Sequence, residues 1–235
     1  PTGGLRRAAG GGIEGLPGYD TGAWWVQDAA ASLPARLLGD VAGKIVLDLC
    51  AAPGGKTAQL AAAGAHVTAV DLSERRLARL AENMKRLDLE IATVTGDAVS
   101  WRPEAPVDAV LLDAPCSGTG TIRRHPDIAW TKSADDPERL SQLQRRMIDN
   151  ALACLKPDGV LVYAVCSLQA QEGEGQLEAA LGRNPDATLE PVEAAEIGGV
   201  AELVDARGCL RTLPCHMARD GGVDGFYAMR LRRSG

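Results

Sequence analysis

Short apolar segments alternate with segments of helical periodicity through most of this chain, and this alternation restricts the fold more than any other feature. Strands that alternate with helices form a mainly parallel sheet covered on both faces. We therefore expect an α/β fold that ends in a hairpin of residues 209–213 and 226–231. The strands are expected at residues 44–49, 66–70, 91–95, 107–112 and 160–165. The helices are expected at residues 24–38, 57–63, 73–86 (with Ser73 as N-cap) and 137–155, and around 177–181.

The composition excludes several classes of protein. No apolar run reaches the roughly 18 residues that a membrane span needs, and no signal-peptide pattern opens the chain. The six cysteines include no Cys-x-x-Cys pair and the three histidines are scattered, so we expect no metal site. Cysteines without the spacing of a disulfide framework indicate a reducing compartment, and we expect a cytoplasmic protein.

The net charge of −6 argues against a protein coated in basic surface, but the charge is unevenly distributed. Residues 121–146 carry six basic and four acidic side chains, and residues 206–235 carry six arginines and two aspartates. These segments are locally +2 and +4, which leaves −12 for the rest of the chain. Two interpretations remain open: the arginines are ordinary solvated side chains, or they form a surface for an anionic partner such as nucleic acid.

Acidic side chains follow three successive strands, at Asp71, Asp97 and Asp113. In a parallel sheet, ligands bind beyond the carboxyl ends of the strands, where an acid after the second strand can accept hydrogen bonds from ribose hydroxyls. Asp97 could accept from an adenine amino group. Each acid alone would be a turn or N-cap carboxylate, but three together favour a nucleoside-containing cofactor. The Gly-x-Gly-x-x-Gly pattern of nicotinamide and flavin proteins is absent.

The turn after the first strand admits two interpretations. Residues 48–57 read Asp-Leu-Cys-Ala-Ala-Pro-Gly-Gly-Lys-Thr. Gly-Lys-Thr at the start of a helix is the second half of a phosphate loop, in which Asp113 would help to hold magnesium. The first glycine of such a loop is replaced here by Cys50, and Ala-Ala-Pro is stiff. The favoured interpretation is a cofactor that approaches the backbone closely at Gly54 and Gly55.

Two cysteines follow expected strands that would be neighbours in the sheet. Cys116 lies in the Asp-Ala-Pro-Cys-Ser-Gly segment of residues 113–118, and Cys166 directly follows the strand of residues 160–165. A lone cysteine at a strand end is usually a small core residue. Two thiols beside Asp113 indicate instead a reactive site, because a thiol is strongly nucleophilic once it ionises.

These motifs resemble those of a known family. Residues 48–57, Asp-Ala-Pro-Cys-Ser-Gly-Thr-Gly at 113–120 and Tyr-Ala-Val-Cys-Ser at 163–167 resemble the RNA cytosine-carbon-5 methyltransferases of the Nop/Sun family. Ile-Arg-Arg-His-Pro-Asp-Ile-Ala-Trp at 122–130 is similar to the bacterial ribosomal RNA branch of that family. The chain departs from the family at Val165, where threonine is usual.

The resemblance extends over about residues 15–233 and includes residues 25–30 and 221–227. It implies a Rossmann-like S-adenosylmethionine-dependent methyltransferase fold with a mainly parallel seven-stranded sheet and helices on both faces. Residues 1–40 would form an N-terminal extension and lead-in helix, and residues 41–235 the catalytic domain. The N-terminal RNA-binding region that this branch usually carries would be absent from this chain.

The resemblance also implies that S-adenosylmethionine is the methyl donor and that no metal takes part. Asp71 would bind the ribose hydroxyls and Asp97 the adenine side, and Asp113 is also expected in the cofactor site. The methionine and ribose end would lie against the backbone of seven consecutive residues: Cys50, Ala51, Ala52, Pro53, Gly54, Gly55 and Lys56.

The same resemblance assigns the catalytic roles. Cys166 would add to carbon 6 of cytosine to make an enamine whose carbon 5 can attack a methyl group. Asp113 would hydrogen-bond the ring nitrogen, and Cys116 would assist release of the product. The flanking phosphates of the RNA would contact Arg123, Arg124 and His125. Trp130 would stack on a base or simply pack.

The implied activity is methylation of carbon 5 of a cytosine in ribosomal RNA, expected to be the 16S RNA of the small subunit. Ribosomal RNA would be the partner, with no membrane and no obligate protein partner. Two alternatives remain. One is a phosphate-loop nucleotide hydrolase that uses Lys56 and Asp113, and the other is a non-catalytic RNA-binding scaffold that has kept the cofactor pocket. Retention of both thiols argues against the scaffold.

Overall fold

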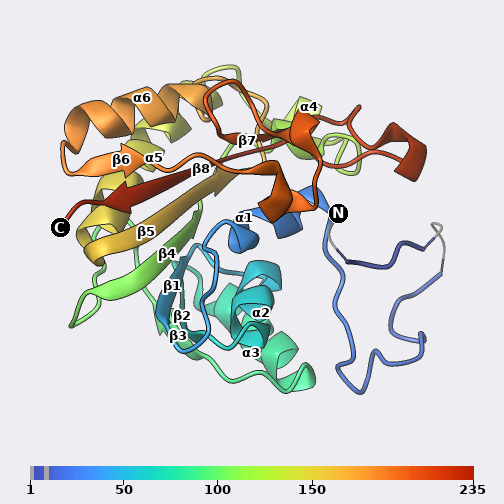
Figure 1. The fold of residues 1–235 in the computed structure, drawn as a ribbon. Coiled ribbons are helices and arrows are strands. Elements are labelled where there is room, and N and C mark those ends of the chain that lie inside the picture. The colour runs from blue at the N-terminus through green and yellow to red at the C-terminus, as the bar shows by residue number, and fades with distance from the viewer. Residues whose placement is uncertain (1–2, 8–10) are drawn as a thin grey trace.

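A computed structural model describes residues 3–7 and 11–235 and contains one mixed sheet of eight strands (Figure 1). The strands follow the order β3-β2-β1-β4-β5-β8-β6, and β7 pairs with β8 outside this path. The first five strands in this order are parallel, whereas β8 runs antiparallel to β5, β6 and β7. The strands span β1 Ile45–Leu49, β2 His66–Asp71, β3 Ala92–Thr95, β4 Val107–Asp113, β5 Leu155–Val165, β6 Ala187–Leu189, β7 Leu210–Thr212 and β8 Phe226–Arg233.

Helices cover both faces of the sheet, as the alternation of segments predicts (Figure 1). On β4, Val110 and Leu112 pack with α5 and α6, whereas Ala109 and Leu111 pack with α1 and α2. Successive residues of a strand point to opposite faces, so the two clusters lie on opposite sides of the sheet. The helices span α1 Leu33–Arg36, α2 Gly55–Ala62, α3 Glu74–Arg86, α4 Ile128–Thr131, α5 Asp136–Ala153 and α6 Glu174–Arg183.

The expected fold class is confirmed, and so are most of the expected elements. Ser73 caps α3, since its hydroxyl accepts a hydrogen bond from the backbone N–H of Arg76. The closing antiparallel pair is also present, as β7 and β8. The sheet has one strand more than the seven expected, because β6 is a three-residue strand that lacks a recognisable apolar alternation.

The expected helix at residues 24–38 is wrong for its first half. Only the short 3₁₀-helix Ala30–Ser32 and α1 form there. The guanidinium of Arg86, on α3, donates hydrogen bonds to the carbonyl oxygens of Tyr19 and Trp24. This contact ties the non-helical segment before the 3₁₀-helix to α3. The expected N-terminal extension, residues 1–40, includes residues 1–2 and 8–10, which lie outside the described residues.

Within the described part of the chain, no helix combines the length and apolar character needed to cross a membrane.

Candidate active site

The residues singled out in the sequence lie together at the carboxyl ends of the parallel strands. The loop of residues 50–54 follows β1, Asp71 ends β2, Asp113 ends β4 and Cys166 follows β5. The order of the strands makes β1 the neighbour of both β2 and β4. The segments that follow these strands therefore surround one site, as expected for ligand sites in open α/β sheets.

The two thiols lie next to each other. The sulfur atoms of Cys116 and Cys166 are 3.5 Å apart. Backbone hydrogen bonds from the N–H of Ala114 to the carbonyl of Ala164 and from the N–H of Gly120 to the carbonyl of Cys166 hold the two loops together. Both sulfur atoms can therefore approach one small ring.

The surroundings of the two sulfur atoms distinguish them chemically. The hydrogen bond from Cys116 lowers the pKa of the Cys166 thiol against the opposing effect of burial, and the nearby ammonium of Lys56 lowers it further. The same hydrogen bond, burial and the neighbouring Glu172 raise the pKa of Cys116 well above its usual value. The opposite directions of the two pKa shifts make Cys166 the thiol that ionises more readily.

Lys56 and Asp113 form an ion pair beside the thiols. The ammonium of Lys56 lies 2.8 Å from Oδ2 of Asp113 and 5.1 Å from the centre of the Phe226 ring. Lys56 is buried, whereas the side chain of Asp113 is 33% exposed. Asp113 is therefore the accessible member of the pair, held in place by a buried cation from the start of α2.

The loop after β1 is shaped by its contacts with the protein. Gly54 has a left-handed backbone (φ 104°), and a Cβ there would lie 2.8 Å from Cγ of Leu80 on α3. Because Gly54 has no side chain, α3 can pack closely against the loop. Burial raises the pKa of Cys50 to about 12, with further contributions from Asp113 and Asp71, so this residue contributes backbone groups and not a thiolate.

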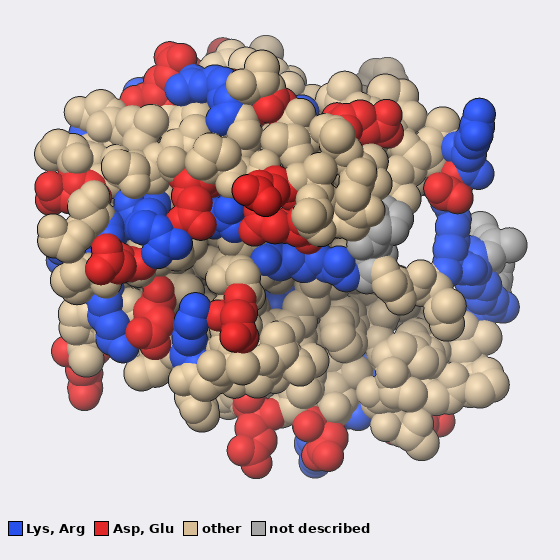
Figure 2. Space-filling model, viewed as in Figure 1, with Lys and Arg blue, Asp and Glu red and all other residues tan. Residues whose placement is uncertain are grey.

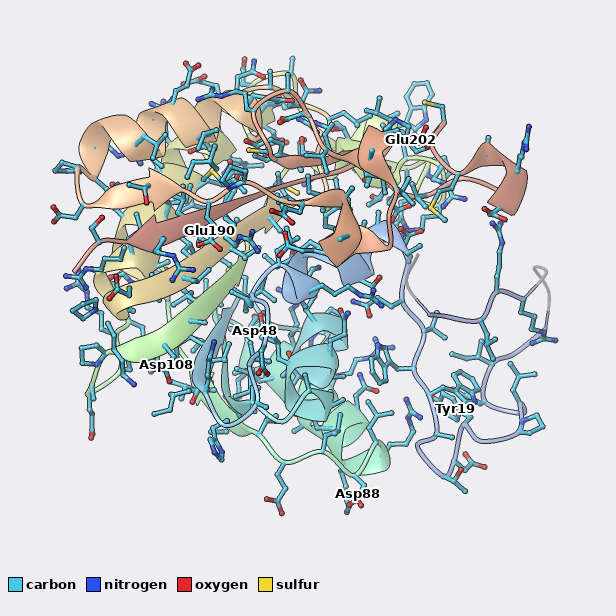
Figure 3. The ribbon with its side chains drawn as sticks, viewed as in Figure 1. Tyr19, Asp48, Asp88, Asp108, Glu190 and Glu202 are labelled. Carbon is cyan, nitrogen blue, oxygen red and sulfur yellow. The ribbon has the colours of Figure 1, made fainter. Side chains whose placement is uncertain are left out.

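Asp48 lies on β1 just before this loop (Figure 3). It connects the strand to the helix that follows the loop, because its carboxyl Oδ2 accepts a hydrogen bond of 2.5 Å from the hydroxyl of Thr57 on α2. Complete burial raises the pKa of Asp48 to about 7. The other carboxyl oxygen of Asp48 is buried without a hydrogen-bond partner.

The two remaining acids differ in their surroundings. Asp71 is only 3% exposed and lies against the loop after β1, where it accepts from the backbone N–H groups of Ala52 and Ser73 and pairs with Arg76. Asp97 is exposed, and its Oδ1 closes a turn by accepting from the N–H of Val99. These carboxylates follow neighbouring strands, and they are the acceptors that a nucleoside with free hydroxyl and amino groups requires. The residues present therefore fit such a cofactor.

The residues expected to contact RNA make contacts within the protein. Arg124 pairs with the buried Asp224 at 2.7 Å and contacts the His125 ring, while Arg123 lies 3.4 Å from Asp28 and 3.5 Å from Asp224. These ion pairs connect the segment after the Cys116 loop to the segment before β8. The guanidinium groups are thus partly neutralised where they stand.

Trp130 does not pack against the protein. Its side chain on α4 is 90% exposed, whereas Ile128 on the same helix lies over Gly118 of the Cys116 loop. The structure therefore presents an indole ring to solvent on the helix that follows the Cys116 loop, and of the two interpretations of Trp130, packing is wrong.

Sequence reasoning missed Glu172, which lies directly behind the two thiols. This carboxylate is completely buried and accepts hydrogen bonds from Ser117, Ser167 and Gln144. An isolated acid between a strand and a helix carries no local signal, and only its five-residue distance from Ser167 connects it to the Cys166 motif.

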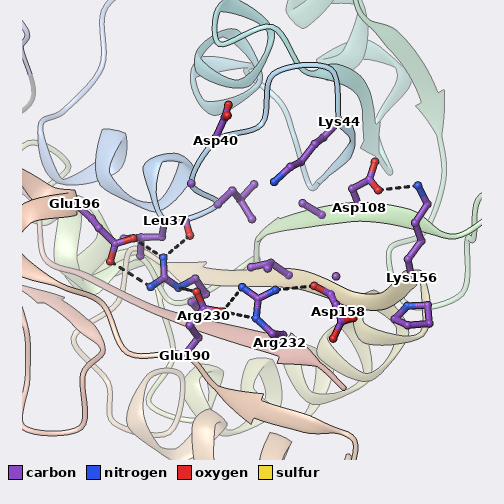
Figure 4. Close-up of a pocket in the computed structure, with 16 residues that line it drawn as sticks. Leu37, Asp40, Lys44, Asp108, Lys156, Asp158, Glu190, Glu196, Arg230 and Arg232 are labelled. Atoms are coloured by element: carbon purple, nitrogen blue, oxygen red, sulfur yellow. Dashed lines mark hydrogen bonds and ion pairs between the residues drawn. The ribbon is translucent and has the colours of Figure 1, made fainter. Parts of the chain in front are cut away.

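A cavity of about 400 Å³ lies at the opposite edge of the sheet, where the strands begin (Figure 4). Several of its charged side chains pair with one another, including Lys156 with Asp108 at 2.7 Å and Arg230 with Glu196 at 2.6 Å. Figure 2 shows basic and acidic side chains interspersed over this face. Because acidic and basic side chains line the cavity in nearly equal number, it presents no strong excess of either charge to a ligand. Among the described residues, no cluster of His, Cys, Asp and Glu side chains could hold a metal ion.

Comparison with known proteins identifies relatives over most of the chain. Residues 35–232 match the model of the family described as 16S rRNA methyltransferase RsmB/F. The ribosomal RNA small subunit methyltransferase B of Vibrio cholerae is 47% identical over 191 residues, which are 79% of this chain and 44% of that protein. The enzyme of the same name from Cronobacter sakazakii is 43% identical, over 83% of this chain and 46% of that protein.

Solved structures show the same relationship. A methyltransferase homologue from Pyrococcus horikoshii superimposes with a TM-score of 0.76 at 29% identity, over 94% of this chain and 72% of that one. NSun6 from the same organism superimposes with a TM-score of 0.80 at 25% identity, over 96% of this chain and 57% of that one. The comparisons give no support to a phosphate-loop hydrolase. The chain spans about half the length of the curated relatives that it matches, and it belongs to the RsmB/F family of 16S rRNA methyltransferases.

Proposed function

We propose that this chain catalyses methylation of carbon 5 of a cytosine in small-subunit ribosomal RNA, with S-adenosylmethionine as methyl donor. The observation that carries the proposal is the pair of sulfur atoms 3.5 Å apart, beside the ion pair of Lys56 and Asp113. A reaction that used one thiol as nucleophile would not need a second thiol this close, so the pair indicates a reaction in which both thiols take part. The names of the related enzymes support ribosomal RNA as the substrate.

The proposed cofactor site is the edge formed by the loop after β1 and the acids that follow β2 and β3. Asp71 would accept from the ribose hydroxyls once Arg76 moves aside, and Asp97 would face the adenine. S-adenosylmethionine, when bound, supplies an electrophilic methyl group. The chain must then generate a carbon nucleophile in the RNA base.

Cys166 is the proposed nucleophile, because it is the thiol that ionises more readily. Its addition to carbon 6 of cytosine turns the ring into an enamine with a nucleophilic carbon 5. Asp113 and Lys56 would hydrogen-bond the polar edge of the ring and stabilise the charge that develops there. Cys116 would assist loss of the carbon 5 proton, after which Cys166 is eliminated and the aromatic ring is restored.

The target cytosine must leave the stack to reach the thiols, at a cost of a few kcal/mol. Trp130, exposed on α4, is the proposed stacking partner for an RNA base. Arg123, Arg124 and His125 would contact phosphates beyond the ion pairs that they already make. We further propose that residues 41–235 are the catalytic domain and that the protein acts in the cytoplasm without an obligate protein partner.

The test is incubation of the protein with labelled S-adenosylmethionine and 16S ribosomal RNA, free or assembled in small subunits, followed by mapping of modified cytosines. We expect label at carbon 5 of a cytosine with the wild-type chain and none with Cys166→Ala. Label at another atom or base, or equal labelling by both proteins, would overturn the proposal.

A further inference from the structure

Glu172 is a buried carboxylate with four hydrogen-bond donors, and among the described residues no cation forms an ion pair with it. Its side chain is 0% exposed. Oε1 accepts from the backbone N–H of Ser117 at 2.9 Å and from the amide of Gln144 at 3.1 Å. Oε2 accepts from the hydroxyls of Ser117 and Ser167, at 2.5 and 2.6 Å. Burial of a carboxylate is costly unless hydrogen bonds satisfy it, and here all four acceptor positions are used.

The two serines directly follow the two cysteines. Ser117 comes after Cys116 in the loop that follows β4, and Ser167 comes after Cys166 in the loop that follows β5. Both hydroxyls converge on one oxygen of Glu172 and lie 3.1 Å from each other. One carboxylate thus connects the two loops that carry the thiols, and Gln144 connects both to α5.

The position of Glu172 also makes the two thiols unequal. Its negative charge lies on the side of Cys116 and helps to raise the pKa of that thiol, whereas Lys56 lies on the side of Cys166 and lowers the pKa there. Asp113 acts against Lys56, because its negative charge raises the pKa of Cys166. Tyr163 faces this cluster from β5, where its hydroxyl donates to the backbone carbonyl of Glu172 at 2.6 Å.

We propose that Glu172 is a positioning residue that holds the Cys116 and Cys166 loops in register, so that Cys116 donates its hydrogen bond to Cys166. That Glu172 matters for methyl transfer rests on the proposed function. That Glu172 holds the two thiols in place does not rest on that function. The thiols can be measured in the protein without RNA or cofactor, so failure of either idea is recognisable separately.

The experiment measures the rate at which iodoacetamide alkylates each cysteine as a function of pH, with the modified peptides resolved by mass spectrometry. The exposed Cys215 serves as an internal reference in every sample. The variants are Glu172→Ala, which removes the carboxylate, and the double variant Ser117→Ala/Ser167→Ala, which removes only the two hydroxyls. Glu178→Gln is the matched control, since it removes a carboxylate from α6 that pairs with Arg207 and is exposed.

In the wild-type protein, the reactivity of Cys166 should have a midpoint below the usual pKa of a thiol, because the contact with Cys116 lowers its pKa. In both test variants the midpoint of Cys166 should rise by about one pH unit or more, because the hydrogen bond from Cys116 is lost. Glu178→Gln should leave it unchanged. If Glu172→Ala does not fold, as judged by circular dichroism, the double serine variant decides the question.

An unchanged midpoint of Cys166 in the folded test variants would overturn the proposal, and so would an equal shift in Glu178→Gln. A separate measurement follows methyl transfer under single-turnover conditions. The rate should fall at least tenfold in the test variants, with unchanged binding of S-adenosylhomocysteine. An inactive wild-type protein would count against the proposed function alone, since the alkylation profiles would still be measurable.

Discussion

Cys116 and Cys166 are separated by 50 residues in the chain, yet their sulfur atoms lie 3.5 Å apart. They come together because β4 and β5 are adjacent parallel strands, with Asp113 paired to Ala164. The loops after these strands then need only a few residues each to meet.

Replacement of Cys166 by serine should abolish methylation while leaving cofactor binding intact. A hydroxyl is a far weaker nucleophile than a thiol at neutral pH, and the loss of a nucleophile costs several orders of magnitude in rate. Methylation assays and calorimetry with S-adenosylhomocysteine measure the two properties. Appreciable turnover by Cys166→Ser would contradict the assignment of the nucleophile.

Replacement of Cys116 by alanine should trap the enzyme on its RNA. If Cys116 assists loss of the carbon 5 proton, the methylated ring remains saturated and Cys166 cannot leave. A covalent protein–RNA species should then survive denaturing electrophoresis, and it should be absent with Cys116→Ala/Cys166→Ala. Accumulation of the adduct in Cys166→Ala instead would reverse the roles of the two thiols.

Replacement of Asp71 should weaken binding of S-adenosylmethionine. Loss of a charge-assisted acceptor for the ribose hydroxyls should cost roughly 1.5–3 kcal/mol, or about ten- to a hundredfold in affinity. Calorimetry on Asp71→Asn, which keeps the size of the side chain, should show this loss. Glu82→Ala, on the exposed side of α3, is the control and should bind normally. Unchanged affinity in Asp71→Asn would place the cofactor elsewhere.

The buried Asp48 should make the protein less stable as the pH rises. Burial raises its pKa from 3.8 to about 7, so the folded protein keeps the proton at pH values where the unfolded chain has lost it. The stability that this group contributes is therefore present below about pH 4 and lost as the pH rises towards 7. Asp48→Asn removes the effect and should stabilise the protein by about 2–3 kcal/mol more at pH 8 than at pH 5.

Urea unfolding of wild type and Asp48→Asn at both pH values measures this difference. Asp108→Asn is the control and should show the same stability difference from wild type at both pH values, since the hydrogen bond from Lys156 lowers the pKa of that carboxyl and leaves it ionised throughout this range. A stability difference between Asp48→Asn and wild type that does not depend on pH would show that Asp48 is ionised in the folded protein.

Replacement of Trp130 by alanine should weaken RNA binding without affecting stability. Stacking of a base on an aromatic ring contributes about 1–3 kcal/mol. The side chain is 90% exposed, so its removal costs the folded protein little. Binding of a single-stranded segment of 16S ribosomal RNA and the thermal midpoint measure the two effects. Unchanged RNA affinity would exclude a stacking role.

Much of the fold follows from local patterns. Each strand of the parallel region is a short apolar run, because both faces of such a strand are buried. Ser73 is a local signal as well, since a cap bonds to the backbone only three residues away. By contrast, β6 has only three residues, and it forms a strand because it pairs with β8. The non-helical segment at Trp24 is likewise tied to a distant residue, Arg86, 62 residues further along the chain.

The α/β class, and the placement of Asp71, Asp113, Cys116 and Cys166 at the carboxyl ends of the parallel strands, can be read from local patterns. Strand ends are recognisable locally, and parallel strands bring their carboxyl ends together. The side chains that hold these strand ends in place become visible in the folded chain alone. Glu172 meets Ser117, and Arg124 meets Asp224, across 55 and 100 residues. Such hydrogen bonds depend on atoms from distant segments meeting within about 3 Å, which no local periodicity encodes.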